Sequence, residues 1–397
     1  MKSLTNKRII LAVSGSIAAY KAPDIVRRLQ DLGAEVRVIL TTGGAKFITE
    51  LSLQATSKNK VHDNLWDSDA ELSMGHIELA KWADIILIAP ASANTISNLA
   101  AGKACNLLTS VTLASDCSIL VAPAMNQQMY SSSALQDNLA LLKGRGFIII
   151  EPESGDQACG DVGLGRLPEP MKIAQTVSEL FTSTELTGKK VLITLGATIE
   201  AIDPVRYISN HSSGKMGMAL VDACLDYGAE VTAIHGNITT QLNDRCNNIS
   251  ATSASQMHQS VMENINEQDV FIACAAVSDY SAKQIQNEKI KKDESSLTIE
   301  LIPNKDILSD VCKLNNKPIT IGFAAETRDF IINAKKKINK KGCDAIILND
   351  VSKPGLGFKS DDNEVVFLTH NNEIKITKSS KQKIGRKIVK IICERLL

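Results

Sequence analysis

The sequence lacks paired cysteines, long apolar runs and charge of one prevailing sign. Its nine cysteines are scattered singly, without a CxxC pair or metal-ligand spacing, so neither a disulfide framework nor a structural zinc site is indicated. This cysteine pattern predicts a reduced, cytoplasmic protein. No segment approaches the roughly 20 apolar residues that span a bilayer. The apolar run from Ile9 to Val13 is too short for the core of a signal peptide. We therefore expect no membrane partner.

The charge balance argues against nucleic acid as a partner. Lys plus Arg and Asp plus Glu each total 44, so the chain has no net electrostatic attraction for a polyanion. An apolar fraction of 44% excludes a disordered chain. At 397 residues the sequence is longer than one hydrophobic core usually supports, and two domains are expected.

Short β-branched runs alternate with helical stretches along the chain, which is typical of βαβ units on a parallel sheet. In the first half, nearly continuous apolar runs predict strands at 8–13, 35–40, 84–89, 118–122 and 147–150. In the second half, strands are expected at 190–195, 230–235, 269–275, 319–323 and 344–348, then a hairpin at 364–369 and 373–377 and a helix over 381–397. The prediction is an α/β protein with two doubly wound, Rossmann-like domains and mainly parallel sheets. The domains span 1–182 and 189–397, and a polar linker covers 183–188.

The turns after the first two strands indicate which nucleotide the first domain does not bind. Ser14–Lys21 lacks the GxGxxG fingerprint of dinucleotide sites. Thr41–Gly44 offers no acid to bind a ribose hydroxyl. An NAD-dependent two-domain dehydrogenase is therefore disfavoured. The small and hydroxyl-bearing residues of the first turn still suit one phosphate at a helix N-terminus, although an ordinary turn explains them equally well.

Two later strand exits have the same small, polar composition. They are Pro90–Thr95 and Ala122–Tyr130, which carry hydroxyl and amide side chains. Because the carboxyl ends of parallel strands meet at one edge of a sheet, these exits and the first turn are expected to line one cleft. The cleft would suit a phosphorylated, planar ligand, and a mononucleotide such as FMN fits that description.

Four motifs of the first half resemble those of the flavin-dependent cysteine decarboxylases: Gly15–Lys21, Gly75–Ile77, Pro90–Thr95 and Pro123–Asn126. A fifth motif, Ala158–Pro170, resembles the substrate flap of the branch that acts on phosphopantothenoylcysteine. The resemblance covers the whole first half and implies that this domain binds FMN. The residues implied to contact FMN are Gly15, Ser16, Ile17, Thr41, Ser92, Asn94 and Thr95.

The same resemblance implies roles for three side chains. Loss of carbon dioxide from an N-acylcysteine needs an electron sink, which a flavin supplies. His76 would assist oxidation of the substrate, Asn126 would hold its carboxylate, and Cys159 would protonate the intermediate that remains. Glycines around Cys159 would permit a lid that closes over the substrate. Taken singly, such a histidine or cysteine is more often structural, and it is the joint pattern that favours catalysis.

The second half carries a hydroxyl-rich loop that runs into a helix. This loop, Asp203–Gly217, closely resembles the signature of phosphopantothenate–cysteine ligases. It is not a P-loop, because Met216 stands where Ser or Thr is required. Further segments support the resemblance, at 275–280, 289–292, 304–307, 322–327 and 349–352. The implied reaction joins 4′-phosphopantothenate to cysteine, with CTP activating the carboxylate as an acyl-cytidylate.

This second resemblance implies that Lys289 stabilises the activation step and binds CTP, and that Asn210 serves turnover of the acyl-cytidylate. Asp279 and Phe323 would contact the cytidine portion. The remaining nucleotide contacts implied are Asn304, Lys305, Asp306, Ile307, and, on the triphosphate, Lys337 and Lys341. The other lysines between 335 and 341 are interpreted as a solvated helix face. No dedicated metal cage is visible, so Mg²⁺ would bind mainly through the CTP phosphates, with Asp279 as one candidate ligand.

Five positions depart from the family patterns: Gly43, Gly44, Cys105, Asn106 and Ala197. The first four would lie near the flavin or a subunit contact, where cofactor affinity or assembly could differ. The resemblance implies a homo-oligomer, such as a dodecamer of trimeric decarboxylase units and paired ligase domains. A different class of protein remains an alternative, namely a non-catalytic flavin-binding regulatory or interaction protein of the same fold. The retained His76, Asn126 and Cys159 argue against that alternative.

Overall fold

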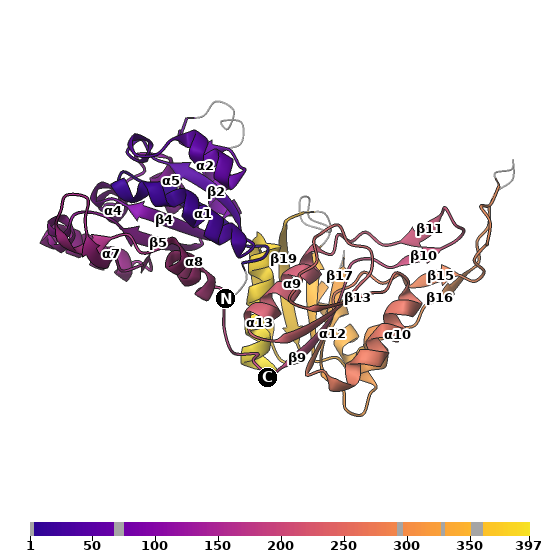
Figure 1. Cartoon of the computed structure of the whole chain (residues 1–397). Helices are drawn as coiled ribbons and strands as arrows, with labels where there is room; N and C mark the ends of the chain where they lie inside the picture. Colours follow the sequence, from indigo (N-terminus) through magenta and orange to yellow (C-terminus); the bar gives the residue numbers. More distant parts are fainter. Residues whose placement is uncertain (1–3, 67–74, 292–296, 327–329, 351–359) are drawn as a thin grey trace. The chain divides into compact units, whose positions relative to one another are not determined.

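The computed structural model describes residues 4–66, 75–291, 297–326, 330–350 and 360–397. The chain divides into two compact units, Met1–Phe181 (unit 1) and Thr182–Leu397 (unit 2), which Figure 1 shows in colours that follow the sequence. Parts of the predicted ligase motifs, at 292, 327, 351 and 352, lie outside the described residues. Each unit has its own hydrophobic core on both faces of one central sheet.

Unit 1 is built on a six-stranded, fully parallel sheet in the order β3-β2-β1-β4-β5-β6. The strands are β1 (Arg8–Val13), β2 (Glu35–Leu40), β3 (Val61–His62), β4 (Ile85–Ala91), β5 (Ser118–Pro123) and β6 (Ile148–Ile149). Their apolar side chains are buried on both faces, which is why the strands are nearly continuous apolar runs in the sequence. The chain reverses its winding direction between β1 and β4.

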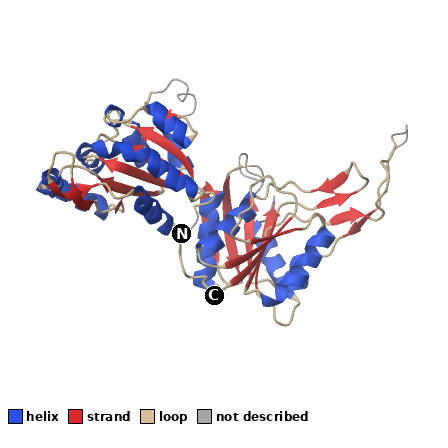
Figure 2. Ribbon diagram, in the orientation of Figure 1, coloured by secondary structure: helices blue, strands red, loops and turns tan. Residues whose placement is uncertain are grey.

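Helices cover both faces of this sheet, as Figure 2 shows. One face packs against α1 (Ala22–Asp31), α2 (Glu50–Ser57) and α8 (Pro170–Glu179). The other packs against α3 (Gly75–Trp82), α4 (Ala93–Ala100), α5 (Leu107–Ala114) and α7 (Ser133–Gly144). The turn after β1 forms a 3-10 helix, η1 (Ile17–Lys21), and α1 begins only at Ala22 because Pro23 fits the first turn of a helix but not its interior.

Three smaller elements complete unit 1. A short 3-10 helix, η2 (Gly44–Lys46), follows β2, and a short helix, α6 (Gln127–Ser131), follows β5. The predicted lid is an antiparallel hairpin of β7 (Glu153–Asp156) and β8 (Val162–Arg166), called the flap hairpin below. The hairpin precedes α8, so its base continues directly into a helix that packs on the core.

Unit 2 has an eight-stranded sheet in the order β13-β12-β9-β14-β17-β18-β19-β20. The strands are β9 (Lys190–Leu195), β12 (Glu230–His235), β13 (Asn247–Ser250), β14 (Val270–Ala273), β17 (Ile319–Glu326), β18 (Ala345–Asp350), β19 (Asp362–Thr369) and β20 (Glu373–Ser380). The first six are parallel, and β19 and β20 form the antiparallel hairpin predicted at a sheet edge. The winding direction reverses between β9 and β14.

The helices of unit 2 again lie on two faces. One face carries α9 (Lys215–Asp226) and α13 (Lys381–Arg395), which pack so closely that a Cβ at Gly385 would lie 2.6 Å from the Ala219 carbonyl oxygen. The other carries α10 (Ala254–Asn264), η4 (Ile265–Glu267), α11 (Ile307–Cys312) and α12 (Phe330–Lys341). Two antiparallel strand pairs project beyond the sheet, β10 (Ile199–Ala201) with β11 (Tyr207–Ser209) and β15 (Tyr280–Ala282) with β16 (Leu301–Pro303).

The predicted fold class, two doubly wound α/β sheets with mainly parallel strands, is confirmed. The strands that were predicted differ at their ends: the one predicted over 84–89 spans Ile85–Ala91, whereas the one predicted over 147–150 shrinks to Ile148–Ile149. Several short strands, among them β3 and β13, were not predicted. Within the part of the chain that is described, none of the helices has both the length and the apolar character required to cross a bilayer.

Candidate functional sites

In unit 1, the turns after β1 and β4 are tied together by one hydroxyl. Ser14 Oγ donates to the Pro90 carbonyl oxygen at 2.7 Å and accepts a hydrogen bond from the Ser92 amide at 2.8 Å. Ser14 is fully buried, so these bonds are shielded from water. They hold the two turns at the point where the winding reverses, which is where doubly wound sheets bind ligands.

A cavity of about 580 Å³ opens beside this point. It brings together four residues of the predicted flavin and substrate sites: Ser16, Ile17, Asn126 and Cys159. Its remaining lining comes from the first turn, the start of the loop after β5 and the flap hairpin, and includes Ala18, Tyr20, Lys21, Ala124, Met125, Gln157 and Arg166. The volume is that of an ordinary cofactor or ligand pocket.

The lining is suited to a phosphorylated, planar cofactor. Ser16 caps η1 by accepting a hydrogen bond from the Ala18 amide, and both residues line the cavity. Ile17 and Tyr20 leave 57% and 63% of their surface exposed at this wall, which offers an apolar surface to a ring system. Hydroxyl and amide donors next to exposed apolar groups match the two ends of FMN.

The other predicted flavin residues lie outside the described lining of this cavity. Thr41 Oγ1 donates to the Val13 carbonyl oxygen at 3.1 Å, which joins the turns after β1 and β2. Ser92 is the N-cap of α4 and accepts a hydrogen bond from the Thr95 amide at 3.3 Å, while Asn94 lies in the first turn of that helix. His76 is half-buried near the start of α3.

The departures at Gly43 and Gly44 have a local explanation in packing. A Cβ at Gly15 would lie 3.1 Å from Gly43 Cα, so the turns after β1 and β2 approach through their glycines. A Cβ at Gly44 would lie 2.6 Å from the Val13 carbonyl oxygen, a distance that side chains do not adopt. Asn106 begins α5 with a reciprocal capping box to Thr109. These residues therefore shape turns and helix ends.

Asn126 and Cys159 meet at the tip of the flap hairpin. Asn126 Nδ2 donates to Asp161 Oδ2 at 2.7 Å, and lies 3.3 Å from both Gln157 Oε1 and Cys159 Sγ. The Cys159 thiol in turn donates to Asp161 Oδ2 at 3.4 Å. Sequence analysis predicted Asn126 and Cys159 but assigned no role to Gln157 or Asp161. The only available signal was their position within two residues of Cys159.

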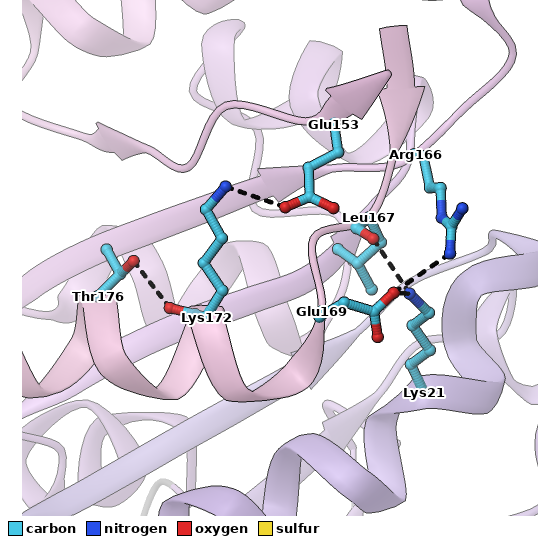
Figure 3. Close-up of polar contacts among 7 residues, drawn as sticks. All are labelled: Lys21, Glu153, Arg166, Leu167, Glu169, Lys172 and Thr176. Atoms are coloured by element: carbon cyan, nitrogen blue, oxygen red, sulfur yellow. Dashed lines mark hydrogen bonds and ion pairs between the residues drawn. The ribbon is translucent and has the colours of Figure 1, made fainter. Parts of the chain in front are cut away.

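The base of the flap hairpin is anchored by an ionic network, which Figure 3 shows. Glu169 Oε1 accepts hydrogen bonds from Lys21 Nζ at 2.9 Å and Arg166 Nη2 at 3.2 Å. Lys21 Nζ also donates to the Leu167 carbonyl oxygen at 3.2 Å, and its side chain is only 9% exposed. The network connects the last residue of β8 to the helical turn that lines the cavity.

In unit 2, a cavity of about 640 Å³ lies at the carboxyl edge of the sheet, between β9 and β14. It gathers most of the residues predicted to contact CTP or the acyl-cytidylate, from β17, α11, α12 and three loops: Asn210, Asp279, Asn304, Lys305, Asp306, Ile307, Phe323, Lys337 and Lys341. The loop before α9, at 211–214, forms another part of its wall. Residues more than 100 positions apart in the sequence therefore meet in one cavity.

Hydrogen bonds fix several of these side chains. Asn210 Nδ2 donates to the Val277 carbonyl oxygen at 2.9 Å, and Asn304 Nδ2 donates to the Ser278 carbonyl oxygen at 2.9 Å. Asp306 caps α11 and forms an ion pair with Lys341 at 2.9 Å. The polar wall is thus held in place by the chain itself, which is what a site needs to orient a charged ligand.

Lys289 is the exception among the predicted ligase residues. It is exposed on the segment between β15 and β16 and lies outside the described lining of the cavity. Sequence analysis also missed two basic residues that do line it. Lys215 forms an ion pair with Asp361 at 2.5 Å, and Lys381 is only 6% exposed, so that burial lowers the pKa of its ammonium group.

One wall of this cavity carries a thiol, Cys274, whose pKa burial raises to about 12. At neutral pH it is therefore a weak donor and not a nucleophile. All nine cysteines are free thiols. Among the described residues, no group of histidine, cysteine and carboxylate side chains is arranged to hold a metal ion.

The Glu169 network predicts a pH-dependent contribution to stability. The hydrogen bond from Lys21 is the main cause that lowers the pKa of Glu169. The contribution is therefore complete above the ordinary glutamate pKa of about 4.3 and is lost as the pH falls through the lowered value. We expect Glu169→Gln to destabilise the chain at pH 7 by about 0.2–1 kcal/mol, the range of exposed ion pairs. Thermal unfolding followed by circular dichroism from about pH 2 to pH 8 measures this.

For Glu169→Gln, the difference in midpoint from the unmodified chain should shrink as the pH falls through the lowered pKa of Glu169, because the native glutamate is then protonated and, like glutamine, uncharged. Asp137→Asn, at an exposed carboxylate within α7, is the matched control and should show no such dependence. A Glu169→Gln deficit of constant size at every pH would contradict the ionic origin of the effect.

Each half of the chain matches a known protein family. Residues 1–182 match the family described as Flavoprotein, and residues 186–396 match the DNA/pantothenate metabolism flavoprotein C-terminal domain. The coenzyme A biosynthesis bifunctional protein CoaBC of Vibrio vulnificus is 47% identical, with 99% of this chain and 98% of that protein covered. The protein of the same name from Haemophilus influenzae is 48% identical with the same coverage.

A solved structure is also similar, the crystal structure of the C-terminal domain of coenzyme A biosynthesis bifunctional protein CoaBC. It is 33% identical, covers 54% of this chain and 98% of that chain, and has a TM-score of 0.47. The family assignment rests on the sequence matches, which extend over nearly the whole length of both partners. The chain belongs to the family of coenzyme A biosynthesis bifunctional proteins.

Proposed function

We propose that the chain catalyses two successive steps of coenzyme A biosynthesis. Unit 2, with 189–397 as its domain, would ligate 4′-phosphopantothenate to cysteine at the expense of CTP. Unit 1, residues 1–182, would decarboxylate the phosphopantothenoylcysteine so formed to 4′-phosphopantetheine with the help of FMN. The observation that carries the proposal is that each unit has its own cavity at the carboxyl edge of its sheet: the cavity of unit 1 contains Asn126 and Cys159, and that of unit 2 contains most of the predicted CTP contacts.

The two family matches support this division, because the Flavoprotein match ends before the second match begins. The short stretch at 183–188 would join the two catalytic domains. The order of the steps follows from chemistry. Ligation creates the amide whose cysteine carboxylate is then removed, so the product of unit 2 is the substrate of unit 1.

Ligation needs an activated carboxylate. The 4′-phosphopantothenate carboxylate would attack the α-phosphate of CTP, releasing pyrophosphate, and the cysteine amine would then displace CMP. Lys337 and Lys341 on α12 would neutralise charge on the triphosphate, as preorganised cations do in phosphoryl transfer. Asp279 and Phe323 would contact the cytidine, and Asn210, held by the Val277 carbonyl, would orient the acyl-cytidylate. Mg²⁺ would bind through the phosphates, with Asp279 as a candidate ligand.

Decarboxylation needs a place for the departing electron pair. FMN, when bound, would supply it by taking a hydride from the thiol-bearing carbon and returning that hydride after carbon dioxide has left, so that no external reductant is needed. Ser16, Ile17 and the η1 backbone would hold the cofactor phosphate end. The Asn126 amide would hold the substrate carboxylate, and the Cys159 thiol, 3.3 Å away, would donate the proton to the carbon that loses carbon dioxide. His76, on α3, would assist the oxidation step.

We also propose that the protein is a homo-oligomer, such as a dodecamer, and that it works in the cytoplasm. The projecting strand pairs of unit 2 expose large apolar side chains, among them Tyr207 at 57%, Tyr280 at 52% and Leu301 at 42%. Exposed apolar groups clustered on such strands are typical of protein contacts. Lys289 lies on the same projection, between β15 and β16.

A coupled assay tests the two activities together. The purified, FMN-loaded chain would receive 4′-phosphopantothenate, cysteine, CTP and Mg²⁺, with pyrophosphate and carbon dioxide followed at the same time. We expect both products, in equal amounts, with 4′-phosphopantetheine formed. Pyrophosphate alone would leave only the ligase assignment standing. If neither product is released, the result would favour the non-catalytic flavin-binding protein, because such a protein needs only the fold and not the catalytic residues.

Cys159→Ser should separate the two activities. Removal of a proton donor typically costs at least about 100-fold in rate, so carbon dioxide release should fall by that factor. Pyrophosphate release should stay unchanged because Cys159 belongs to the other cavity. Cys117→Ser, at a half-buried cysteine of unit 1 outside the described linings of both cavities, is the matched control and should retain both activities. Normal carbon dioxide release by Cys159→Ser would remove the thiol from the reaction.

Lys289→Gln should have the opposite effect. Loss of a cation that stabilises the activation step is expected to lower pyrophosphate release about 100-fold. Added phosphopantothenoylcysteine should still be decarboxylated at the normal rate. Lys291→Gln changes an exposed lysine two positions away and serves as the control. Equal losses in both variants would mean that only the net charge of this segment matters, and the specific role of Lys289 would be refuted.

A further inference from the structure

The side-chain amide of Asn126, which is proposed to hold the substrate carboxylate, already donates a hydrogen bond to a carboxylate of the chain itself. Asn126 Nδ2 has two hydrogens, and its shortest contact is with Asp161 Oδ2 at 2.7 Å. Gln157 Oε1 and Cys159 Sγ lie at 3.3 Å from the same nitrogen. The donor capacity of this amide is therefore used fully, and a substrate carboxylate can bind there only by replacing one of the three acceptors.

Asp161 is the acceptor that such a substrate has to replace. Its carboxylate has the same chemical form as the departing group, and two carboxylates on one amide would repel each other at hydrogen-bonding distance. Gln157 is less easily displaced, because its Oε1 also accepts a hydrogen bond from the Gln127 amide at 3.0 Å and its Nε2 donates to the Leu164 carbonyl oxygen at 3.3 Å.

The turn at the tip of the flap hairpin sets Asp161 in this place. The Gln157 amide donates to the Asp161 carbonyl oxygen at 2.8 Å, and the Gly160 amide donates to the Gln157 carbonyl oxygen at 2.9 Å. Gly160 has a φ of +88°, a backbone conformation that favours glycine. The turn thus places the Asp161 carboxylate against both Asn126 and Cys159, although Asp161 itself is exposed to solvent.

We propose that Asp161 is a specificity-determining residue of the decarboxylase, which occupies the carboxylate position on Asn126 until substrate displaces it and returns to that position once carbon dioxide has left. The proposal rests on the proposed decarboxylase function. Substrate binding then has to break the contact between Asp161 and Asn126. The decarboxylated product has no carboxylate to bind that amide, so it can bind with the contact intact. Asp161 therefore weakens binding of the carboxylated ligand but not of the decarboxylated one. Its return to Asn126 after the reaction favours release of carbon dioxide over rebinding of carbon dioxide.

A pair of unreactive ligands tests this without turnover. 4′-Phosphopantothenoyl-alanine keeps the carboxylate but has no thiol, and 4′-phosphopantothenoyl-ethylamine lacks both. Their dissociation constants for the FMN-loaded full chain would be measured by isothermal titration calorimetry. In Asp161→Asn, which keeps the shape and removes the charge, and in Asp161→Ala, which removes the competitor, we expect the alanine derivative to bind about tenfold more tightly. Binding of the ethylamine derivative should stay the same.

Asp137→Asn is the matched control, because it removes one charge from an exposed position on α7, outside the described lining of the cavity, and leaves Asp161 in contact with Asn126. Its affinity ratio for the two ligands should equal that of the unmodified chain. Equal changes for both ligands in the Asp161 variants would indicate a general effect on cavity shape and would overturn the proposal. An unchanged ratio in both variants would overturn it as well.

The experiment distinguishes a failure of the decarboxylase assignment from a failure of the role proposed for Asp161. If the unmodified chain releases no carbon dioxide from phosphopantothenoylcysteine and binds neither ligand, the decarboxylase assignment itself fails. If the unmodified chain binds both ligands and turns over its substrate, but Asp161→Asn and Asp161→Ala leave the ratio of dissociation constants untouched, only the role of Asp161 is rejected.

Discussion

The reversal of winding between two adjacent parallel strands is the constraint on which both sites depend. Helices leave β1 and β4 towards opposite faces of the sheet in unit 1, and the same happens at β9 and β14 in unit 2. This leaves a crevice at the carboxyl ends that no helix covers. In unit 1 the buried Ser14 hydroxyl holds the two turns together. In unit 2 the Ala276 amide, which donates to the Gly196 carbonyl oxygen at 2.8 Å, has the same effect.

The two sites use this crevice in different ways. In unit 2 the side-chain amides of Asn210 and Asn304 in the wall donate hydrogen bonds to backbone carbonyls. In unit 1 the wall is partly a hairpin whose base is fixed by Glu169 and whose tip contacts Asn126 through exposed polar side chains. A fixed base with a displaceable tip suits a reaction in which a carboxylate enters and carbon dioxide leaves.

The fold could be predicted well where burial shapes the sequence. Buried parallel strands are nearly continuous apolar runs, and the predicted bounds 8–13, 35–40, 190–195 and 230–235 are those of β1, β2, β9 and β12. The two-residue β3 and the exposed strand pairs β10 with β11 and β15 with β16 were not predicted, because short or solvent-exposed strands carry no apolar run. Asn126 and Cys159 were expected in one site on family motifs, and they lie in contact.

The sequence by itself determined the two α/β domains, their apolar strands and the residue types available at each strand exit, because these depend on local pattern and composition. Only the tertiary structure decided which of those residues meet. It placed Lys381 in the wall of the ligase cavity and Lys289 outside its described lining, and it brought Asp161 onto Asn126. Such contacts join residues that are tens to hundreds of positions apart. They are therefore set by how strands, turns and the flap hairpin pack, which no local pattern records.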